Sequence, residues 1–381
     1  MNNVNEVIDK EHCCGCTACY ACCPVNAITM QPDDEGFLYP IVDYQECVSC
    51  GKCVTVCQNI QFYSEPQHIY ASRSIDSLRL RSSSGGIFSK LAEKILGEGG
   101  GICAVGYSDD CKECLHKIIY TIDDLDDLRR AKFVQSKKYN IYREVELQLK
   151  QGRTMLFCGT PCEVGGLRQY LDNEYENLLT CDLICGCVSS PDVFRRYIDF
   201  LNEKYQSKVI SVNFKDKRRG RREKSIAISF QNGYEYYNSI LDDDYCVSFH
   251  SRYNIRPSCF ACKYRSLARV SDITLGDFWA IEKYNKEFDD NKGTSFVLIN
   301  SAKGERYYNS LENIDDHLMD IDLNQYCTLY NWCMHRNPTK MPKDERATFY
   351  SDVHTMKFDE MASKDLATIK EMRKQKKLQY K

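Results

Sequence analysis

The 381-residue sequence lacks three features, and each absence excludes a class of protein. It has no apolar run of about 18 residues, so we expect no membrane span. Residues 1–6 contain no apolar stretch of the kind that directs export, so we expect a cytoplasmic protein whose thiols stay reduced. The 51 Lys and Arg nearly balance the 54 Asp and Glu, which leaves a formal charge of −3, so no overall field points to nucleic acid as a partner.

Cysteine is the residue that the sequence has in excess. The chain holds 23 cysteines, and ten of them fall within the first 57 residues. In a reducing compartment such a cluster indicates metal ligands or catalytic groups rather than disulfides. Hydrophobic residues at 43% and charged residues at 28% are ordinary for a globular protein, and the length suits about two or three domains. We therefore expect a globular metalloprotein.

Two runs near the N-terminus repeat the cysteine spacing C-x2-C-x2-C-x3-C, followed by Pro24 in the first run and Gln58 in the second. This spacing is typical of bacterial ferredoxins with two 4Fe-4S clusters, in which the fourth cysteine of each run binds the other cluster. The predicted ligands are therefore, for one cluster, Cys13, Cys16, Cys19 and Cys57, and for the other, Cys23, Cys47, Cys50 and Cys53. Zinc is the alternative, but it usually takes two C-x2-C pairs, and eight cysteines are too many for one zinc site. We interpret Cys14 and Cys22, which fall outside the pattern, as packing residues.

The body of the chain alternates apolar strands with helices after a short linker at 64–68. Strand 154–158 leads into helix 163–170, and strand 178–185 leads into helix 192–205. Such units predict an α/β layer, in which ligands gather beyond the carboxyl ends of the strands, where Cys162 and Cys185 lie. Further strands are predicted at 69–73, 209–214, 225–230, 234–240, 272–279 and 295–300. The expected fold is mixed α+β and α/β, with a small ferredoxin-like domain first.

Four other segments have open interpretations. A Ser/Gly loop at 82–86 opens a helix at 87–97, which suits a phosphate, but a helix cap with a tight turn is equally compatible. The segment 215–224 holds seven bases and two acids, and it is either a site for a phosphorylated ligand or acidic partner, or a solvated hairpin tip. The pair Cys259 and Cys262 is a redox pair or half of a metal site. The Lys-rich segment after residue 350 is predicted to be a solvated terminal helix.

Together these segments resemble the coenzyme F420 hydrogenase/dehydrogenase β-subunit family, with a fused two-cluster ferredoxin. The matching motifs lie at 82–86, 132–136, 159–162 with 166–168, 182–185, 257–262 and 272–279. The resemblance covers roughly residues 1–310. It divides the chain into a 2x 4Fe-4S ferredoxin-type domain (1–63), a flavin-binding N-terminal-type region (69–172), a C-terminal-type region (173–335) and a helical, Lys-rich tail (336–381).

The resemblance implies that FAD is bound by the α/β domain and that a third 4Fe-4S cluster lies beside it. It places the flavin phosphates on Ser83, Ser84, Gly85 and Gly86. It places Lys132, Gln135 and Ser136 along the flavin, with Lys132 as the candidate catalytic residue, and Thr160 and Pro161 at the wall beside the ring. The implied third-cluster ligands are Cys162, Cys185, Cys259 and Cys262.

The sequence departs from the family at two of these motifs. Arg130-Ala131 stands where the family often has Gly-Ser before the lysine. Cys185-Gly186-Cys187 stands where the family often has Cys-His-Gly, which leaves open whether Cys185 or Cys187 is the ligand.

The predicted function is that of an iron-sulfur flavoprotein oxidoreductase, which passes electrons between a two-electron donor or substrate at FAD and one-electron clusters. Its expected partners are a small-molecule hydride donor or substrate and a redox partner protein or soluble ferredoxin. The alternative is a non-catalytic iron-sulfur electron-transfer component of a larger complex. A nucleic-acid-binding iron-sulfur protein is disfavoured because the aromatic residues are not interleaved with the basic ones.

Overall fold

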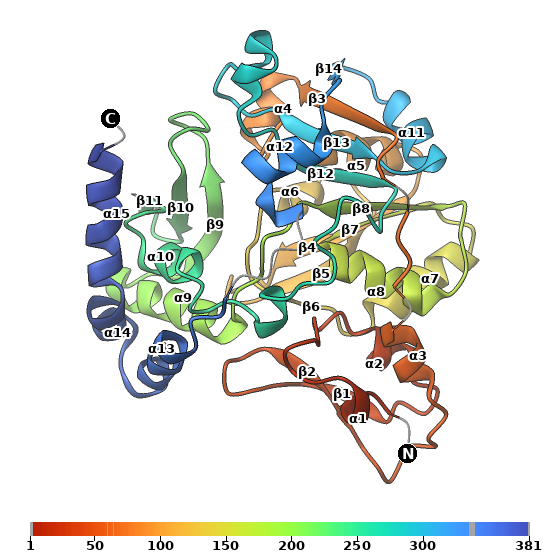
Figure 1. Ribbon diagram of the computed structural model, residues 1–381, viewed down its shortest axis with the longest axis horizontal. Helices are drawn as coiled ribbons and strands as arrows, with labels where there is room; N and C mark the ends of the chain where they lie inside the picture. Colours follow the sequence, from red (N-terminus) through yellow and green to blue (C-terminus); the bar gives the residue numbers. More distant parts are fainter. Residues whose placement is uncertain (1–2, 59, 64, 335–339, 380–381) are drawn as a thin grey trace.

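A nine-stranded mixed sheet forms the centre of the computed structural model, which describes residues 3–58, 60–63, 65–334 and 340–379 (Figure 1). Strands β12, β8, β7 and β4 run parallel to one another, whereas β13, β3, β14 and β5 pair antiparallel. In order across the sheet the strands are β14 (Ile314–Leu318), β3 (His68–Ser74), β13 (Ser295–Ile299), β12 (Ile273–Asp277), β8 (Leu178–Leu183), β7 (Met155–Gly159), β4 (Gly101–Tyr107), β5 (Cys114–Ile119) and β6 (Ser136–Lys137).

Both faces of this sheet are covered by helices, which explains why its central strands are apolar throughout. Every residue of β7 is buried, and its side chains alternate between the two faces. Leu156 packs on the face covered by α5 (Ile87–Gly97), α6 (Leu125–Leu128) and α11 (Ala302–Asn309). Phe157 packs on the opposite face, under α7 (Ile141–Lys150) and α8 (Pro161–Leu171).

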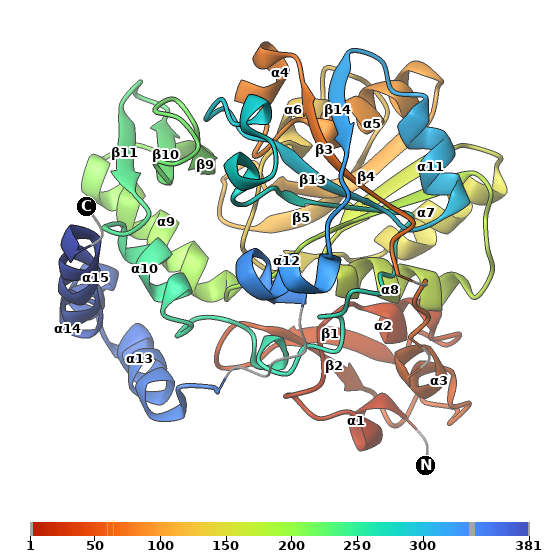
Figure 2. The same ribbon diagram turned by 45° about the horizontal axis from the view of Figure 1, so that its top comes forward.

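The N-terminal domain lies beneath α7 and α8 (Figures 1 and 2). Its antiparallel strands β1 (Ile28–Pro32) and β2 (Leu38–Val42) stand beside α1 (Val4–Val7), α2 (Ala18–Cys22) and α3 (Lys52–Gln58). Side chains of α2 and α3 share one buried apolar cluster with Val164 and Leu167 of α8. The first helix of the cysteine runs therefore packs directly on the α/β domain.

A second, smaller sheet carries the basic segment predicted from the sequence. It consists of β9 (Val209–Asp216), β10 (Ser225–Phe230) and β11 (Glu235–Ser239), all antiparallel, as the sequence predicted. Helices α9 (Pro191–Tyr205) and α10 (Asp244–His250) pack against it. The nine-stranded and three-stranded sheets together confirm the mixed α/β class.

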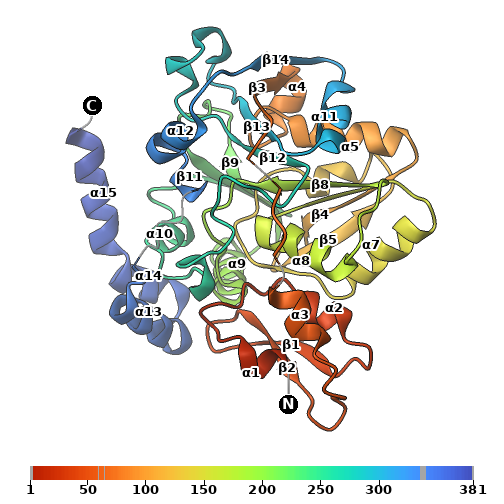
Figure 3. The same cartoon turned by 45° about the vertical axis from the view of Figure 1, so that its right-hand side comes forward.

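The C-terminal segment is helical, as predicted, but the prediction that it is solvated is wrong for its buried positions. Helices α13 (Lys343–Thr355) and α14 (Phe358–Asp365) bury Val353, Met361 and Leu366 in an apolar cluster that also holds Tyr197 and Leu201 of α9. Figure 3 shows the two helices at the foot of α15. Arg346 and Asp352 of α13 are buried as well, while α15 (Ala367–Gln379) extends the tail. The buried apolar residues are few and stand among polar ones, so the sequence pattern alone does not indicate their burial.

The remaining short elements connect these layers. They are α4 (Asp76–Leu80), α12 (Leu323–Tyr330) and the 3-10 helices Pro257–Cys259, Ile281–Lys283, Lys286–Phe288 and Trp332–Met334. Among the helices of the described chain, none is both long and apolar enough to cross a membrane. Residue 64 of the expected linker and the expected boundary between residues 335 and 336 lie outside the described residues.

Candidate metal centres

One set of cysteines surrounds a hollow on the outer side of the N-terminal domain. Cys47, Cys50 and Cys53 line this hollow together with Cys23, the last cysteine of the first run. The loop between Cys47 and Cys53 has a left-handed backbone conformation at Ser49 (φ 53°), which residues other than glycine rarely adopt. The fourth cysteine of one run therefore faces three cysteines of the other, which is the crossed arrangement expected of a two-cluster ferredoxin.

A second set of thiols gathers on the inner side of the same domain. Burial, followed by the thiols of Cys13 and Cys57, raises the pKa of Cys19 well above its usual value. Burial, followed by the thiol of Cys13, likewise raises the pKa of Cys57 to about 11. Cys57 comes from the second run, so the crossing is reciprocal. Cys16 lies against α8, where a Cβ added to Gly166 would stand 3.0 Å from its Sγ.

A third set converges where β7 and β8 end. Cys162 is the second residue of α8, Cys185 follows β8, and the 3-10 turn Pro257–Cys259 presents Cys259 with Cys262 just beyond it. Burial and then the thiols of Cys259, Cys162, Cys187 and Cys262 raise the pKa of Cys185 well above its usual value. Burial and then Cys262 raise the pKa of Cys259 to about 12. All four predicted thiols are thus mutual neighbours, although they come from three separate segments.

The surroundings of Cys185 and Cys187 differ, which bears on the choice between them. The thiol of Cys185 interacts with Cys162, Cys259 and Cys262. Besides burial, the cysteines that raise the pKa of Cys187 are Cys259 and Cys333. Cys185 therefore faces the whole of the third set and Cys187 only its edge.

Cys14 connects the second and third sets, a role that the sequence pattern did not indicate. A hydrogen bond with Cys16 and burial raise the pKa of Cys14 well above its usual value, and a further hydrogen bond joins it to Cys162. Cys162 is also 3.1 Å from Oγ1 of Thr160. The three sets consequently form a row that runs from the surface of the N-terminal domain to the edge of the large sheet.

The cysteine sets have the chemistry of cubane sites rather than of sites for one ion. Within residues 3–58, 60–63, 65–334 and 340–379, no three His, Cys, Asp or Glu side chains stand close enough to hold a single metal ion. In a 4Fe-4S cluster each cysteine binds a different iron, so the four thiols surround the cluster instead of meeting at a point. Four thiols per set fit that group.

Arg256 is a functional candidate that sequence reasoning missed. It is fully buried between the N-terminal domain and the third set. Its Nε donates to the carbonyl of Cys13 at 2.9 Å, its Nη2 lies 3.7 Å from the Cys13 Sγ, and its Nη1 donates to Gln135 at 3.1 Å. Its own carbonyl accepts the N–H of Cys259. One cation therefore contacts ligand segments of two predicted clusters.

The predicted phosphate loop is tied into the protein by its own polar groups. Ser83 Oγ accepts the N–H of Ala131 at 2.7 Å, and Ser84 Oγ donates to the carbonyl of Thr294 at 2.9 Å. A Cβ on Gly85 would stand 2.3 Å from the carbonyl oxygen of Ser72, so glycine is required there by the strands alone. Gly86 (φ 92°) precedes α5, whose first turn has no side-chain cap. The loop therefore offers uncapped backbone N–H groups, but the proton of the Ser84 hydroxyl is already donated to Thr294.

The other predicted flavin residues lie in three separate places. Lys132 Nζ donates to the carbonyls of Arg129 and Asp127, at 2.7 and 2.9 Å, and burial lowers its pKa to about 8. Gln135 Oε1 accepts from Arg256 and from the N–H of Leu38, at the boundary with the N-terminal domain.

Ser136, Thr160 and Pro161 lie beside the third set. Ser136 Oγ donates to Glu163 at 2.8 Å, and the N–H of Thr160, which caps α8 ahead of Pro161, donates to the same carboxylate at 2.9 Å. Glu163 also pairs with Lys138 at 3.0 Å. This buried polar group was not predicted, although Glu163 directly follows Cys162.

Comparisons with known proteins agree with both halves of the predicted resemblance. Residues 152–318 match the family described as the C terminus of the beta subunit of coenzyme F420 hydrogenase/dehydrogenase, and residues 12–59 match the 4Fe-4S dicluster domain. A curated relative, one of the subunits of the F(420)H(2) dehydrogenase of Methanosarcina mazei, is 21% identical over 325 residues, which are 81% of this chain and 85% of that protein. A chain of the F420-reducing [NiFe] hydrogenase complex from Methanosarcina barkeri is 15% identical, with a TM-score of 0.49, over 72% of this chain and 90% of that one.

Proposed function

We propose that this chain, which joins a 4Fe-4S dicluster domain to a C-terminal domain of the coenzyme F420 hydrogenase/dehydrogenase β-subunit family, conducts electrons along three 4Fe-4S clusters. The family is one of oxidoreductases, and the dicluster domain makes the chain an iron-sulfur protein. The observation that carries the proposal is the row of three cysteine sets, joined by the contacts of Cys14 with Cys16 and Cys162. A row of this kind is what stepwise one-electron transfer requires.

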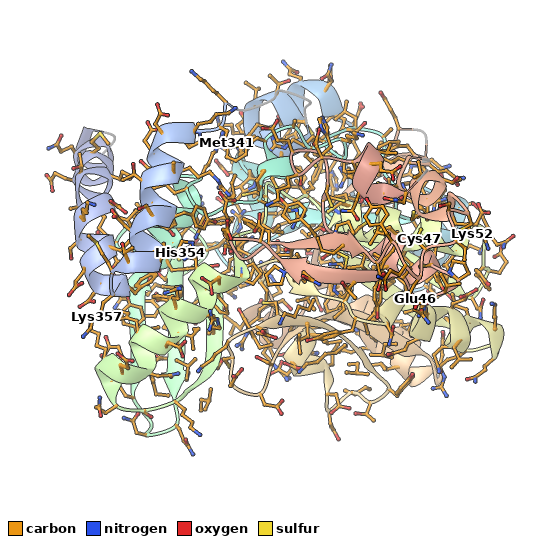
Figure 4. The ribbon with its side chains drawn as sticks, turned by 90° about the horizontal axis from the view of Figure 1, so that it is seen from below. Glu46, Cys47, Lys52, Met341, His354 and Lys357 are labelled. Carbon is orange, nitrogen blue, oxygen red and sulfur yellow. The ribbon has the colours of Figure 1, made fainter. Side chains whose placement is uncertain are left out.

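The outer end of the row is the proposed exit to a redox partner protein or a soluble ferredoxin. Cys50 is exposed, as are Val48 and Lys52 on the same loop. Figure 4 shows Glu46, Cys47 and Lys52 together on the small domain, apart from His354 and Lys357 on the C-terminal helices. A cluster held by Cys23, Cys47, Cys50 and Cys53 would thus lie nearest to a docked partner.

The inner end of the row is the proposed entry for electron pairs. The third cysteine set lies at the carboxyl ends of parallel strands, where α/β folds place their ligands. We propose that FAD binds on this side, with its phosphates near the uncapped first turn of α5. Bound FAD would supply the exchange between a two-electron hydride donor and one-electron clusters.

The donor class follows from the resemblance to the curated relative. That relative belongs by name to an F(420)H(2) dehydrogenase, so a reduced deazaflavin is the first donor to test, with NADH and NADPH beside it. Lys132 is the proposed catalytic residue, because burial lowers its pKa to about 8, where it can exchange a proton near neutral pH.

A second candidate function is electron transfer without a flavin in this chain. It is favoured by the hydrogen bond that Ser84 Oγ donates to the carbonyl of Thr294, because a hydroxyl that has spent its one proton cannot donate to a phosphate. In that case the exchange between electron pairs and single electrons would take place on another protein of a larger complex. This chain would only transfer single electrons between its clusters.

The experiment that tests the proposal uses protein purified without oxygen. Released flavin is identified and counted, and the holoprotein is mixed with reduced deazaflavin, NADH or NADPH while flavin and cluster absorbance are recorded. The proposal predicts about one FAD per chain and bleaching of the flavin followed by the clusters. Clusters that are reduced by dithionite, in a chain without any flavin, would establish the second candidate instead.

A further inference from the structure

Four cations gather at the carboxyl end of β12, and we call Lys215, Lys217, Arg221 and Lys224 the cation cluster. They come from the basic hairpin between β9 and β10, whose tip the sequence left as either a ligand site or a solvated turn. In the structure the tip folds back toward the large sheet. Its partners are the Ser84 loop, Asp277 at the end of β12, and Trp279.

The hairpin tip is fixed in place by its backbone. Gly220 has φ 88°, and a Cβ there would stand 2.0 Å from Nδ2 of Asn291, so only glycine fits. The N–H of Arg221 donates to the carbonyl of Asn291 at 2.8 Å, and the N–H of Arg222 donates to its side chain at 3.0 Å. The cations are therefore held against the sheet rather than spread in solvent.

Lys217 is the most deeply placed member of the cation cluster. Its side chain is 7% exposed, and its Nζ donates to the carbonyls of Ser84 and Lys292 at 2.8 and 2.9 Å. Burial lowers its pKa to about 7, with Arg79, Arg221 and Lys215 acting in the same direction against the opposing effect of Asp277. The neighbouring cations destabilise the protonated form of this lysine, and an anion that binds beside it would stabilise that form.

The carboxylates around the cation cluster do not balance it. Within the described part of the chain, its ion pairs lead only to Asp277, which is 2.8 Å from Lys215 Nζ and 3.5 Å from Arg221 Nε. Nε and Nη2 of Arg221 are buried without a hydrogen-bond partner. The site therefore has four cations around one carboxylate, and Nη2 of Arg221 makes no hydrogen bond, so an anion could bind there and offset the excess positive charge.

Trp279 holds the outer part of the cation cluster in position. The guanidinium of Arg221 lies 4.1 Å from the centre of its ring, and Nζ of Lys224 lies 4.5 Å from it. A stacked guanidinium keeps its edge free for a planar, bidentate contact with phosphate oxygens. The site thus combines excess charge with oriented donors.

We propose that the cation cluster binds the phosphate groups of a phosphate-bearing redox ligand at the carboxyl end of β12. The inference deepens the proposed function and rests on it for the ligand's redox role, but the anion site itself rests on the contacts above. Phosphate esters on this chain have two sources, the bound flavin cofactor and a soluble phosphorylated hydride donor. Both present the same chemistry to Arg221 and Lys217.

The first test measures the binding of inorganic pyrophosphate by calorimetry to the full-length protein after any bound flavin has been released, so that a cofactor does not occupy the site. We expect Arg221→Gln to weaken binding at least about tenfold, and Lys217→Gln with Arg221→Gln to weaken it further, because charge-assisted hydrogen bonds are lost. The matched control is Arg218→Gln on the same hairpin, since Arg218 pairs with Asp216 and Glu235 instead and should leave binding within about twofold.

Two further arms identify the source of the phosphate. Loss of FAD from the double variant at unchanged cluster content would assign the site to the cofactor. Retained FAD with weaker binding of NADPH or reduced deazaflavin would assign it to the donor, and both results support the proposal. Pyrophosphate should also raise the melting temperature of the wild type but not of the double variant.

The proposal is overturned if pyrophosphate binds the wild type and the folded double variant equally, or binds neither. A different result would be pyrophosphate binding that depends on Arg221 in a protein whose clusters accept no electrons from any donor. That result would support the anion site and contradict the proposed function. Arg221→Lys, which keeps the charge but loses the planar fork, should recover part of the affinity.

Discussion

The guanidinium of Arg256 lies against the backbone and the sulfur of Cys13, 2.9 Å from the carbonyl oxygen and 3.7 Å from Sγ. The same guanidinium stands 4.2 Å from the centre of the Tyr39 ring and is closed off from solvent. Hydrogen bonds and positive charge near cluster sulfurs favour the reduced, more negative cluster. Arg256 is therefore placed to set the reduction potential of the cluster that Cys13 is proposed to hold.

Replacing Arg256 by Gln should lower that potential, because the reduced cluster loses a charged donor. We expect at least about a tenfold shift in the one-electron equilibrium, which is about 59 mV. Redox titration followed by electron paramagnetic resonance measures it, and Arg256→Lys should show a smaller shift.

Arg143→Gln is the matched control for this variant. Arg143 donates to the carbonyls of Ala21, Tyr20 and Cys23 but to no thiol. An equal shift of the reduction potential in both variants would show that the loss of any nearby charge lowers it. An unchanged potential in Arg256→Gln would contradict the role assigned to Arg256.

The crossed ligands of the N-terminal domain predict which cluster each mutation removes. Cys57→Ala should damage the cluster of Cys13, Cys16 and Cys19, because the Cys57 thiol faces Cys13. Electron paramagnetic resonance spectra of the reduced variant should still show the signal of the cluster assigned to Cys23, Cys47, Cys50 and Cys53.

Cys22→Ala is the control for crossed ligation. Cys22 lies beside Cys53 and Cys23, and burial with these thiols raises its pKa to about 12, but it stands outside the ligand spacing. Both signals should survive in this variant. Loss of the Cys47, Cys50 and Cys53 cluster alone from Cys57→Ala would refute the crossing.

His116 should make stability fall at mildly acidic pH. Burial lowers its pKa to about 4, and its Nε2 has no hydrogen-bond partner. The unfolded chain binds the proton from about pH 6.5 downward, whereas the folded chain does so only near pH 4, so stability is lost between these values. Between pH 7.5 and 5.5 the expected loss in the free energy of unfolding is about 1 kcal/mol.

The comparison for His116 is His116→Gln, which can still bond to Ser136 but does not titrate. Urea denaturation at the two pH values should show a smaller loss in the variant. The same loss in both proteins would mean that another group controls the acid sensitivity.

Much of the fold was predictable because its signals are local. Strand 154–158 and helix 192–205 agree with β7 and α9 to within a residue or two, since a buried apolar run and a stripe at helical spacing depend on neighbours in sequence. The strands β4 and β5 were not predicted. Their pairing with each other and with β7 is a property of the whole sheet.

The candidate site was predictable to a similar extent. The two N-terminal sets could be predicted from cysteine spacing, because three of the four cysteines of each set are close neighbours in sequence. Cys14 and Arg256 were missed, since their partners Cys162 and Cys13 lie far away in sequence. The burial of Met361 and Leu366 could not be predicted for the same reason, because both belong to an apolar cluster whose other members, such as Tyr197 and Ile226, lie far away in sequence.

The iron content of the chain, with and without Cys259, tests the row of three clusters most directly. Anaerobically reconstituted wild type should contain about 12 iron atoms per chain, at about four per cubane, and Cys259→Ser should contain about eight with both N-terminal resonance signals intact. A wild type that saturates at about eight, or a Cys259→Ser variant with unchanged iron, would contradict the third cluster and with it the proposed path of electrons.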